Sequence, residues 1–404
     1  MRRRKQIGAI ALLAALLTGA AGASFAQVRT KPAPSTEFKT LATQAEAARE
    51  AGHLDEAAAL YRDALRINPR WAEGWWWLGA IDYDSDRYAG AAPEFQKVVA
   101  LEPSYATARV LLGLCQFHLG LDGEALKNIE AAKVGDIADD VQLRQEVLYV
   151  EGVLLQRAGR FEAAREALGS LCQCGAAGQD AVMALGMVAL WMTDAQPPVA
   201  GEAAQVTLHV GLGACLDARK NYDAGRREFE SVAASSPHFR NFHLAYGRFL
   251  EDAGNSSGAI REYKLAIQDE PSSVLARFLI GAAEYKVDSA AGVPYAEEAA
   301  RLAPKLPYVH YLLGLLLVDT GEFKRAVPEL EIARKAFPGE ARIELALGSA
   351  YAHVGRVEDA AHARAEFQRL NKAQKAQNAA KGEPGTGGAA QIEIKDGMET
   401  AERP

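Results

Sequence analysis

The feature of this 404-residue sequence that most constrains its fold is a small residue that returns about every 34 positions. Successive members of the series are separated by 34, 34, 39, 34, 27, 34, 34, 33 and 34 residues. The series consists of Ala45, Gly79, Gly113, Gly152, Gly186, Gly213, Gly247, Gly281, Gly314 and Gly348. A fixed period of this length indicates one supersecondary unit that is repeated along the chain, each copy burying its apolar face against the next.

The residues between these markers indicate what each unit is. Residues 307–338 read as an apolar helix, a tight turn, a second helix and a closing proline. Proline ends helices because it lacks an N–H and clashes with the preceding turn, and Pro69, Pro103, Pro237, Pro271, Pro304 and Pro338 recur at 33 or 34 residues within each block. Glycine tolerates the left-handed backbone of a tight turn, and the expected turn glycines are Gly52, Gly120, Gly159, Gly254, Gly321 and Gly355.

This pattern resembles the tetratricopeptide repeat, a helix-turn-helix unit of 34 residues. A small residue of the second helix recurs as Ala57, Ala91, Ala125, Ala164, Ala259, Ala326 and Ala360. A large residue four positions later recurs as Tyr61, Phe95, Ile129, Leu168, Tyr263 and Leu330, with Phe229 at the equivalent place. The resemblance covers roughly residues 37–370 and implies an all-α, right-handed solenoid of about ten helix pairs.

Two departures from the period divide the array. Five extra residues follow Gly113, and the acids around residues 134–140 predict a longer polar loop there. Seven residues are missing after Gly186, and Pro197 and Pro198 fall where a second helix should run, so this helix is expected to be cut short or replaced by a loop. We therefore expect an N-terminal block at 37–193, a joint at 194–205, and a C-terminal block at 206–380 that ends in a capping helix.

The N-terminus reads as a targeting segment. Residues 1–26 begin with Arg2, Arg3, Arg4 and Lys5, continue as an apolar run, and end with small residues before a cleavage site at Gln27. The run is short for a bilayer span of about 20 residues, although an uncleaved anchor is the alternative. The sequence thus predicts an exported chain, periplasmic or secreted, with a linker at 27–36 and a disordered tail at 381–404.

Charge narrows the class of partner. Removing the four positive charges of residues 1–26 changes the formal net charge from −7 to −11. Nucleic-acid binding needs a basic face, so we expect no nucleic-acid partner. After cleavage of residues 1–26 we expect no membrane span either.

The resemblance also implies a concave groove lined by residues of the first helix of each pair. Aromatic side chains are frequent anchors at protein interfaces. The residues carried over to this groove are Trp76, Tyr83, Phe117, Tyr149, Phe278, Tyr285, Tyr308 and Tyr311. For each of them, packing against the neighbouring helix is the alternative interpretation. Trp75 falls at the family's own packing tryptophan, and His243 and His310 fall at the same position, so packing is expected for these three.

The four cysteines leave several possibilities open. Cys115 and Cys215 each follow a repeat glycine in apolar surroundings, which indicates small core residues. Cys172 and Cys174 lie beside Gly175, where a local disulfide and weak metal binding are both open. No recognised catalytic, cofactor or zinc motif occurs in the sequence. The sequence therefore predicts no enzyme, no cofactor and no metal site.

These observations favour a non-enzymatic scaffold or adaptor of the cell envelope that binds a peptide or protein surface in the groove. The identity of that protein partner is left open. The alternative is a small-molecule or glycan-binding protein, or a hydrolase, with its site near residues 172–204. Its motivation is the broken period, the Cys172/Cys174 pair and the nearby Trp191.

Overall fold

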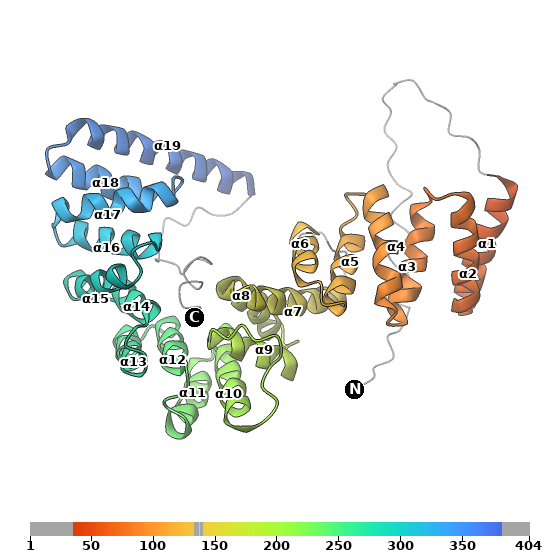
Figure 1. Cartoon of the computed structure of the whole chain (residues 1–404), viewed down its shortest axis with the longest axis horizontal. Helices are drawn as coiled ribbons and strands as arrows, with labels where there is room; N and C mark the ends of the chain where they lie inside the picture. Colours follow the sequence, from red (N-terminus) through yellow and green to blue (C-terminus); the bar gives the residue numbers. More distant parts are fainter. Residues whose placement is uncertain (1–34, 133–136, 138–139, 382–404) are drawn as a thin grey trace. The chain divides into compact units, whose positions relative to one another are not determined.

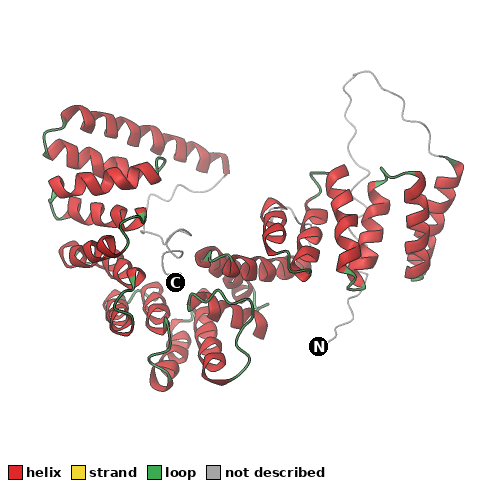
Figure 2. Ribbon diagram, viewed as in Figure 1, coloured by secondary structure: helices red, strands yellow, loops and turns green. Residues whose placement is uncertain are grey.

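The regular structure of the chain is helical. The computed structural model describes residues 35–132, 137 and 140–381. Within these residues there are 19 α-helices and no strand (Figure 2). Consecutive helices pack against one another (Figure 1) from α1 to α6 (residues 36–132), from α8 to α11 (161–235) and from α12 to α19 (242–381). The predicted all-α solenoid is confirmed.

The chain divides into two compact units, residues 1–154 and 155–404. The helices of the N-terminal unit are α1 (Thr36–Glu50), α2 (Leu54–Ile67), α3 (Ala72–Asp84), α4 (Tyr88–Leu101), α5 (Ala106–His118), α6 (Asp122–Ala132) and most of α7 (Val141–Arg157). Those of the C-terminal unit are α8 (Phe161–Gln173), α9 (Gln179–Ala189), α10 (Gly201–Ala218), α11 (Tyr222–Ser235), α12 (Phe242–Asp252), α13 (Ser256–Asp269), α14 (Val274–Glu284), α15 (Ser289–Leu302), α16 (Pro307–Asp319), α17 (Phe323–Ala336), α18 (Ala341–His353) and α19 (Val357–Lys381).

The repeated small residue lies where the two helices of a pair come closest. A Cβ atom on Gly79 would lie 3.0 Å from the ring of Phe95, and one on Gly247 would lie 2.3 Å from the ring of Tyr263. The large residue lies 16 positions after the glycine in both pairs. The spacing in the sequence thus reflects close packing, in which the large side chain of the second helix fills the space above the glycine of the first.

The turn between paired helices explains the second series of glycines. All six expected turn glycines have positive φ, from 74° at Gly159 to 81° at Gly355. Asp86 and Lys220 occupy the equivalent position in two other pairs and adopt φ values of 57° and 59°. The expected turn glycines are confirmed, and in these two pairs the left-handed turn is formed without glycine.

The seven missing residues after Gly186 have a clear structural origin. A Cβ on Gly186 would lie 2.0 Å from the Thr207 carbonyl oxygen, and one on Gly211 would lie 2.0 Å from that of Val182. The backbones of α9 and α10 therefore touch. The same α10 also packs against α11, through Gly213 and Phe229. One long helix thus serves two pairs, and a loop containing Pro197 and Pro198 precedes it.

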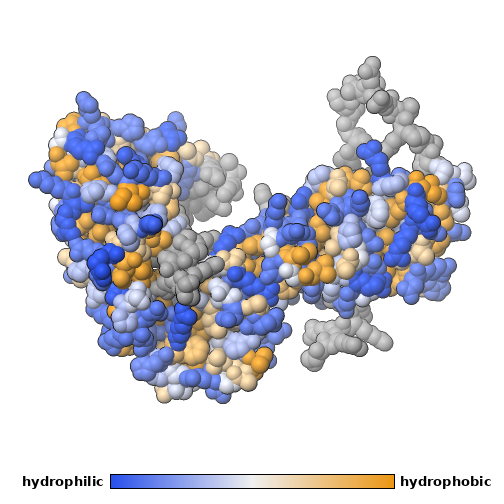
Figure 3. Space-filling view, viewed as in Figure 1, coloured by the Kyte–Doolittle hydropathy of each residue, from blue (hydrophilic) through white to orange (hydrophobic). Residues whose placement is uncertain are grey.

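Each unit has its own apolar core. One cluster of buried residues extends from Ala45 to Leu154, and another extends from Leu190 to Ala363. On the face drawn in Figure 3, hydrophilic residues are interspersed with hydrophobic ones, as expected for helices that bury one side. No helix among the described residues is long and apolar enough to cross a membrane.

Several predicted segments are not tested by this structure. The targeting segment 1–26, the disordered tail after residue 381 and most of the loop at 134–140 lie outside the described residues. The predicted block boundaries also stay predictions. The two units divide after Leu154, whereas the irregular helix packing lies at α9 and α10 within the C-terminal unit.

Candidate functional site

The predicted groove aromatics of the N-terminal unit differ in their exposure. Trp76 is 4% exposed, with its ring centroid 5.0 Å from that of Tyr105. Tyr83 is 3% exposed and donates a hydrogen bond of 3.0 Å to Glu146. Burial raises the pKa of Tyr83, and the Glu146 carboxylate raises it further. Packing is the interpretation that fits these two residues, whereas Phe117 and Tyr149 are half-buried.

The C-terminal unit shows the same division. Phe278 is fully buried in the core, and Tyr311 is 8% exposed, so packing fits both. Tyr285 and Tyr308 are half-buried. The ring of Tyr308 lies 4.5 Å from that of Phe337. Four of the eight predicted residues therefore keep surface for a partner: Phe117, Tyr149, Tyr285 and Tyr308.

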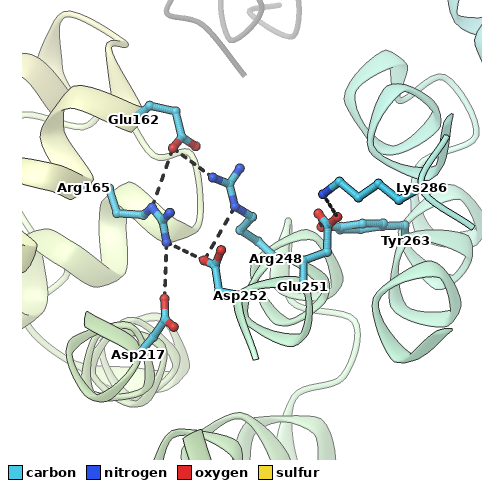
Figure 4. Close-up of polar contacts among 8 residues, drawn as sticks. All are labelled: Glu162, Arg165, Asp217, Arg248, Glu251, Asp252, Tyr263 and Lys286. Carbon is cyan, nitrogen blue, oxygen red and sulfur yellow. Dashed lines mark hydrogen bonds and ion pairs between the residues drawn. The ribbon is translucent and has the colours of Figure 1, made fainter. Parts of the chain in front are cut away.

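A charged network that the sequence analysis missed links α8, α10 and α12 (Figure 4). Arg165 Nη1 lies 2.7 Å from Asp252 Oδ2 and 3.3 Å from Asp217 Oδ2. Arg248 Nη2 lies 3.1 Å from Glu162 Oε2, and Arg248 Nε lies 3.7 Å from Asp252 Oδ2. We call these five residues the charged network. Beside it, Glu251 accepts a hydrogen bond of 2.8 Å from Tyr263 and lies 3.7 Å from Lys286 (Figure 4).

The electrostatics of the network follow from burial and crowding. Burial raises the pKa of Asp217 to about 6, and the neighbouring Asp252 carboxylate adds to the shift while Arg165 opposes it. Burial alone would lower the pKa of Arg248, but the carboxylates of Glu162 and Asp252 outweigh this and raise it. Arg248 is thus held as a cation, and burial makes the Asp217 carboxyl group costly to ionise.

A small cavity adjoins the network. Its volume is about 30 Å³, and Phe161, Trp191, Asp217 and Phe249 are among the side chains that line it. Two polar atoms of its lining residues, Asp217 Oδ1 and Trp191 Nε1, are buried without a hydrogen-bond partner among the described residues. Trp191 also has φ of 51°, which is unusual for a bulky side chain. Unsatisfied buried polar groups are rare and call for an explanation.

One signal in the sequence would have found this site. Asp217 and Glu251 each lie four residues after a repeat glycine, at Gly213 and Gly247. Tyr83, Phe117 and Tyr285 occupy this same position in other repeats. At the middle of the array this position thus changes from aromatic to acidic residues, which is the sequence signal for the site.

The cysteines require a correction. Cys172 and Cys215 form a disulfide between α8 and α10, with their Cα atoms 5.3 Å apart. Cys215 is therefore not merely a small core residue, and Cys172 does not pair with Cys174, which is exposed. Cys115 is buried as expected. Among the described residues, no group of three or more His, Cys, Asp or Glu side chains has a geometry suited to a metal ion.

Comparisons with known proteins locate the repeats. A sequence model described as tetratricopeptide repeat matches residues 43–81, 81–140, 212–274 and 311–379, which together span more than half of the chain. No curated protein matches the chain.

Solved structures of low similarity also align with the chain. A crystal structure of MamA is 23% identical with a TM-score of 0.38, and the alignment covers 41% of this chain and 97% of that protein. MamA from Desulfovibrio magneticus is 18% identical with a TM-score of 0.39, over 45% of this chain and 99% of that protein. A tetratricopeptide repeat protein from Parabacteroides merdae is 14% identical with a TM-score of 0.32, over 70% and 100% respectively.

Proposed function

The chain belongs to the tetratricopeptide repeat family, and from this premise we propose that it is a non-enzymatic adaptor of the cell envelope that binds a peptide or protein surface. Repeats of this family generally act as protein-interaction scaffolds. The observation that carries the proposal is that half-buried aromatic side chains remain at predicted groove positions in both units. These side chains are Phe117, Tyr149, Tyr285 and Tyr308.

Two observations support export. Residues 1–26 have the pattern of a secretory signal peptide. The Cys172–Cys215 disulfide supports an oxidising compartment, because structural disulfides are rare in reducing cytosol. Cell fractionation followed by N-terminal sequencing tests this part of the proposal. Export predicts a mature chain that begins at Gln27, and an intact Met1 in a cytosolic fraction would contradict it.

The binding proposal is tested by crosslinking in the native envelope followed by capture of the full chain. The test variant replaces the four half-buried aromatic residues by alanine. The control variant replaces Ile67 and Leu265, two exposed apolar residues of second helices, by alanine. We expect defined partners to be captured by wild type and control and lost with the test variant. Capture of the same partners by all three proteins would contradict the groove assignment.

The alternative of a small-molecule or glycan site near residues 172–204 finds no support in the cavity there. Pockets for small molecules typically measure about 300–1,000 Å³, whereas the cavity beside Trp191 measures about 30 Å³. This space suits a single polar group at the tip of a side chain, and it does not suit a sugar ring.

A further inference from the structure

We propose that the charged network and the cavity beside Trp191 form a recognition pocket for the ammonium group of a lysine side chain on the partner protein. The inference deepens the proposed adaptor function and rests on it. It assigns the chemical group that the C-terminal unit recognises.

The first argument is the balance of charge. The charged network holds three carboxylates (Glu162, Asp217 and Asp252) and two guanidinium groups (Arg165 and Arg248). The neighbouring Glu251 is matched by Lys286. The ion pairs of the network therefore leave one negative charge uncompensated, and Lys220 acts on Asp217 through its charge alone. A partly buried charge is costly unless it is paired, so a cation is the group that this site favours.

The second argument is the atom that lacks a partner. Asp217 is 7% exposed, and its Oδ2 faces Arg165. Its Oδ1 has no hydrogen-bond partner among the described residues, and the residue lines the cavity. An ammonium group donates three hydrogen bonds, and one of them satisfies this oxygen.

The third argument distinguishes lysine from arginine. A guanidinium group binds a carboxylate best through both oxygens, and Arg165 already occupies one oxygen of Asp217. A cavity of about 30 Å³ holds a compact ammonium head. The aromatic walls formed by Phe161, Trp191 and Phe249 suit the methylene stem and the cation.

The fourth argument is position. Asp217 lies on the first helix of its pair at the place taken by Tyr83, Phe117 and Tyr285 in other repeats. The pocket therefore belongs to the same helix face to which the proposed function assigns the partner. Within the C-terminal unit, this face therefore carries an acidic position as well as the aromatic Tyr285.

Binding at this pocket should depend on pH. Burial raises the pKa of Asp217 to about 6, and the groups that act on it are Asp252, Arg165 and Lys220. Below this pH the carboxyl group is protonated and the excess negative charge disappears. Ammonium binding is thus expected near pH 7.5 and should weaken at least several-fold at pH 5.

The test uses n-butylammonium as a probe of the lysine side chain and n-butanol as a neutral probe of the same shape. The full chain labelled with ¹⁵N is titrated with each probe, and the indole N–H signal of Trp191 is followed by NMR. The Trp191→Phe variant assigns this signal among the five tryptophans of the chain. We expect a saturable shift with n-butylammonium at pH 7.5, at least tenfold stronger than with n-butanol, and weakened at pH 5.

Two variants sharpen the test. Asp217→Asn keeps the size of the side chain and removes its charge, and should reduce n-butylammonium binding at least tenfold. Glu251→Gln is the matched control, because Glu251 is an adjacent carboxylate that does not line the cavity. Equal responses to both probes, a response that sodium chloride reproduces, or unchanged binding by Asp217→Asn would overturn the proposal. If the pocket fails these tests while aromatic-dependent capture persists, the adaptor function stands and only the lysine pocket is lost.

Discussion

At the scale of single residues, one position of the first helix performs the same task with different side chains. Its side chain donates a hydrogen bond to the carbonyl of the proline that ends the preceding helix. The donors and acceptors are Trp75 to Pro69 at 2.9 Å, Arg109 to Pro103 at 3.1 Å, Arg277 to Pro271 at 2.7 Å and His310 to Pro304 at 2.9 Å. The proline lies two residues after the last helical residue, and in these four repeats the donor satisfies its carbonyl group. His243 holds the same position but contacts Glu262 and Asp269 instead.

His310 provides a test of this role. Its Nδ1 lies 2.6 Å from Glu329 Oε2 while its Nε2 faces the Pro304 carbonyl. We expect His310→Ala to lower the free energy of unfolding by about 2–3 kcal/mol, because both contacts of the imidazole ring are lost. Urea denaturation measures this change. His238→Ala is the control, since His238 pairs with Asp269 at the exposed surface and should cost less than about 1 kcal/mol. Equal losses in the two variants would contradict the assigned role.

Glu94 in α4 gives a residue-scale prediction about pH. Burial, together with the charge of Asp82, raises the pKa of Glu94 to about 8. The folded chain thus binds this proton more tightly than the unfolded chain does, so the contribution of Glu94 to stability declines as pH rises from about 4.5 to 8. Glu94→Gln should remove this decline and raise stability at pH 8 by about 2 kcal/mol after allowance for solvent screening. Thermal unfolding at pH 5 and pH 8 tests this, and an unchanged difference between the two pH values would refute it.

At the scale of helices, the contact between α9 and α10 is the departure that matters most. The sequence predicted a shortened or replaced helix, because seven residues were missing and two prolines intervened. It did not predict that α10 would supply the missing surface itself. The two helices approach through Gly186 and Gly211, and Gly211 lies outside the repeated series. The only sequence signal of a contact between two backbones is the pair of glycines that allows it.

This contact predicts a strong effect of adding one methyl group. Gly186→Ala places a Cβ against the Thr207 carbonyl, 2.0 Å away in the present geometry. Overpacking of this kind typically costs about 1–3 kcal/mol, and backbone cannot move aside as a flexible side chain can, so we expect about 3 kcal/mol. Gly169→Ala in α8 is the matched control, because its new Cβ would be 3.6 Å from Ala218, an ordinary contact. Equilibrium unfolding measures the loss of stability in both variants. A loss with Gly186→Ala that is no larger than with Gly169→Ala would argue against close backbone packing.

At the scale of the whole molecule, two cores imply two cooperative units. The Cys172–Cys215 disulfide lies entirely within the C-terminal unit and closes a loop with a sequence separation of 43 residues. Constraint of the unfolded chain by such a loop is worth about 4 kcal/mol. Reductant should therefore lower the unfolding temperature of the C-terminal unit and leave that of the N-terminal unit unchanged. Calorimetry with and without reductant measures both transitions.

Two cysteine variants provide the controls for this prediction. Cys215→Ser should reproduce the effect of reductant, and Cys174→Ser should not, because Cys174 is exposed and lies outside the disulfide. The C-terminal transition can be followed by Trp191, since the other four tryptophans lie in the N-terminal unit. A reductant effect that persists in Cys215→Ser would show that this disulfide is not its source.

The sequence predicted the helical class, the paired small and large residues and the turn glycines, because all of these follow from local sterics with a fixed period. The site was predicted less well. Whether Trp76 or Tyr308 keeps any exposed surface depends on which helices follow, and the period does not encode this. The disulfide and the charged network join residues from different repeats, whose proximity follows only from the way that α8, α10 and α12 pack.

The helix shared between two pairs also bears on how a gene for such a chain changes length. If every helix belonged to one pair, insertions and deletions would preserve the array only in steps of a whole repeat. Because α10 packs against both α9 and α11, the array continues through a shortfall of seven residues. The length of such an array can thus change by less than a whole repeat, provided that glycines allow two helix backbones to meet.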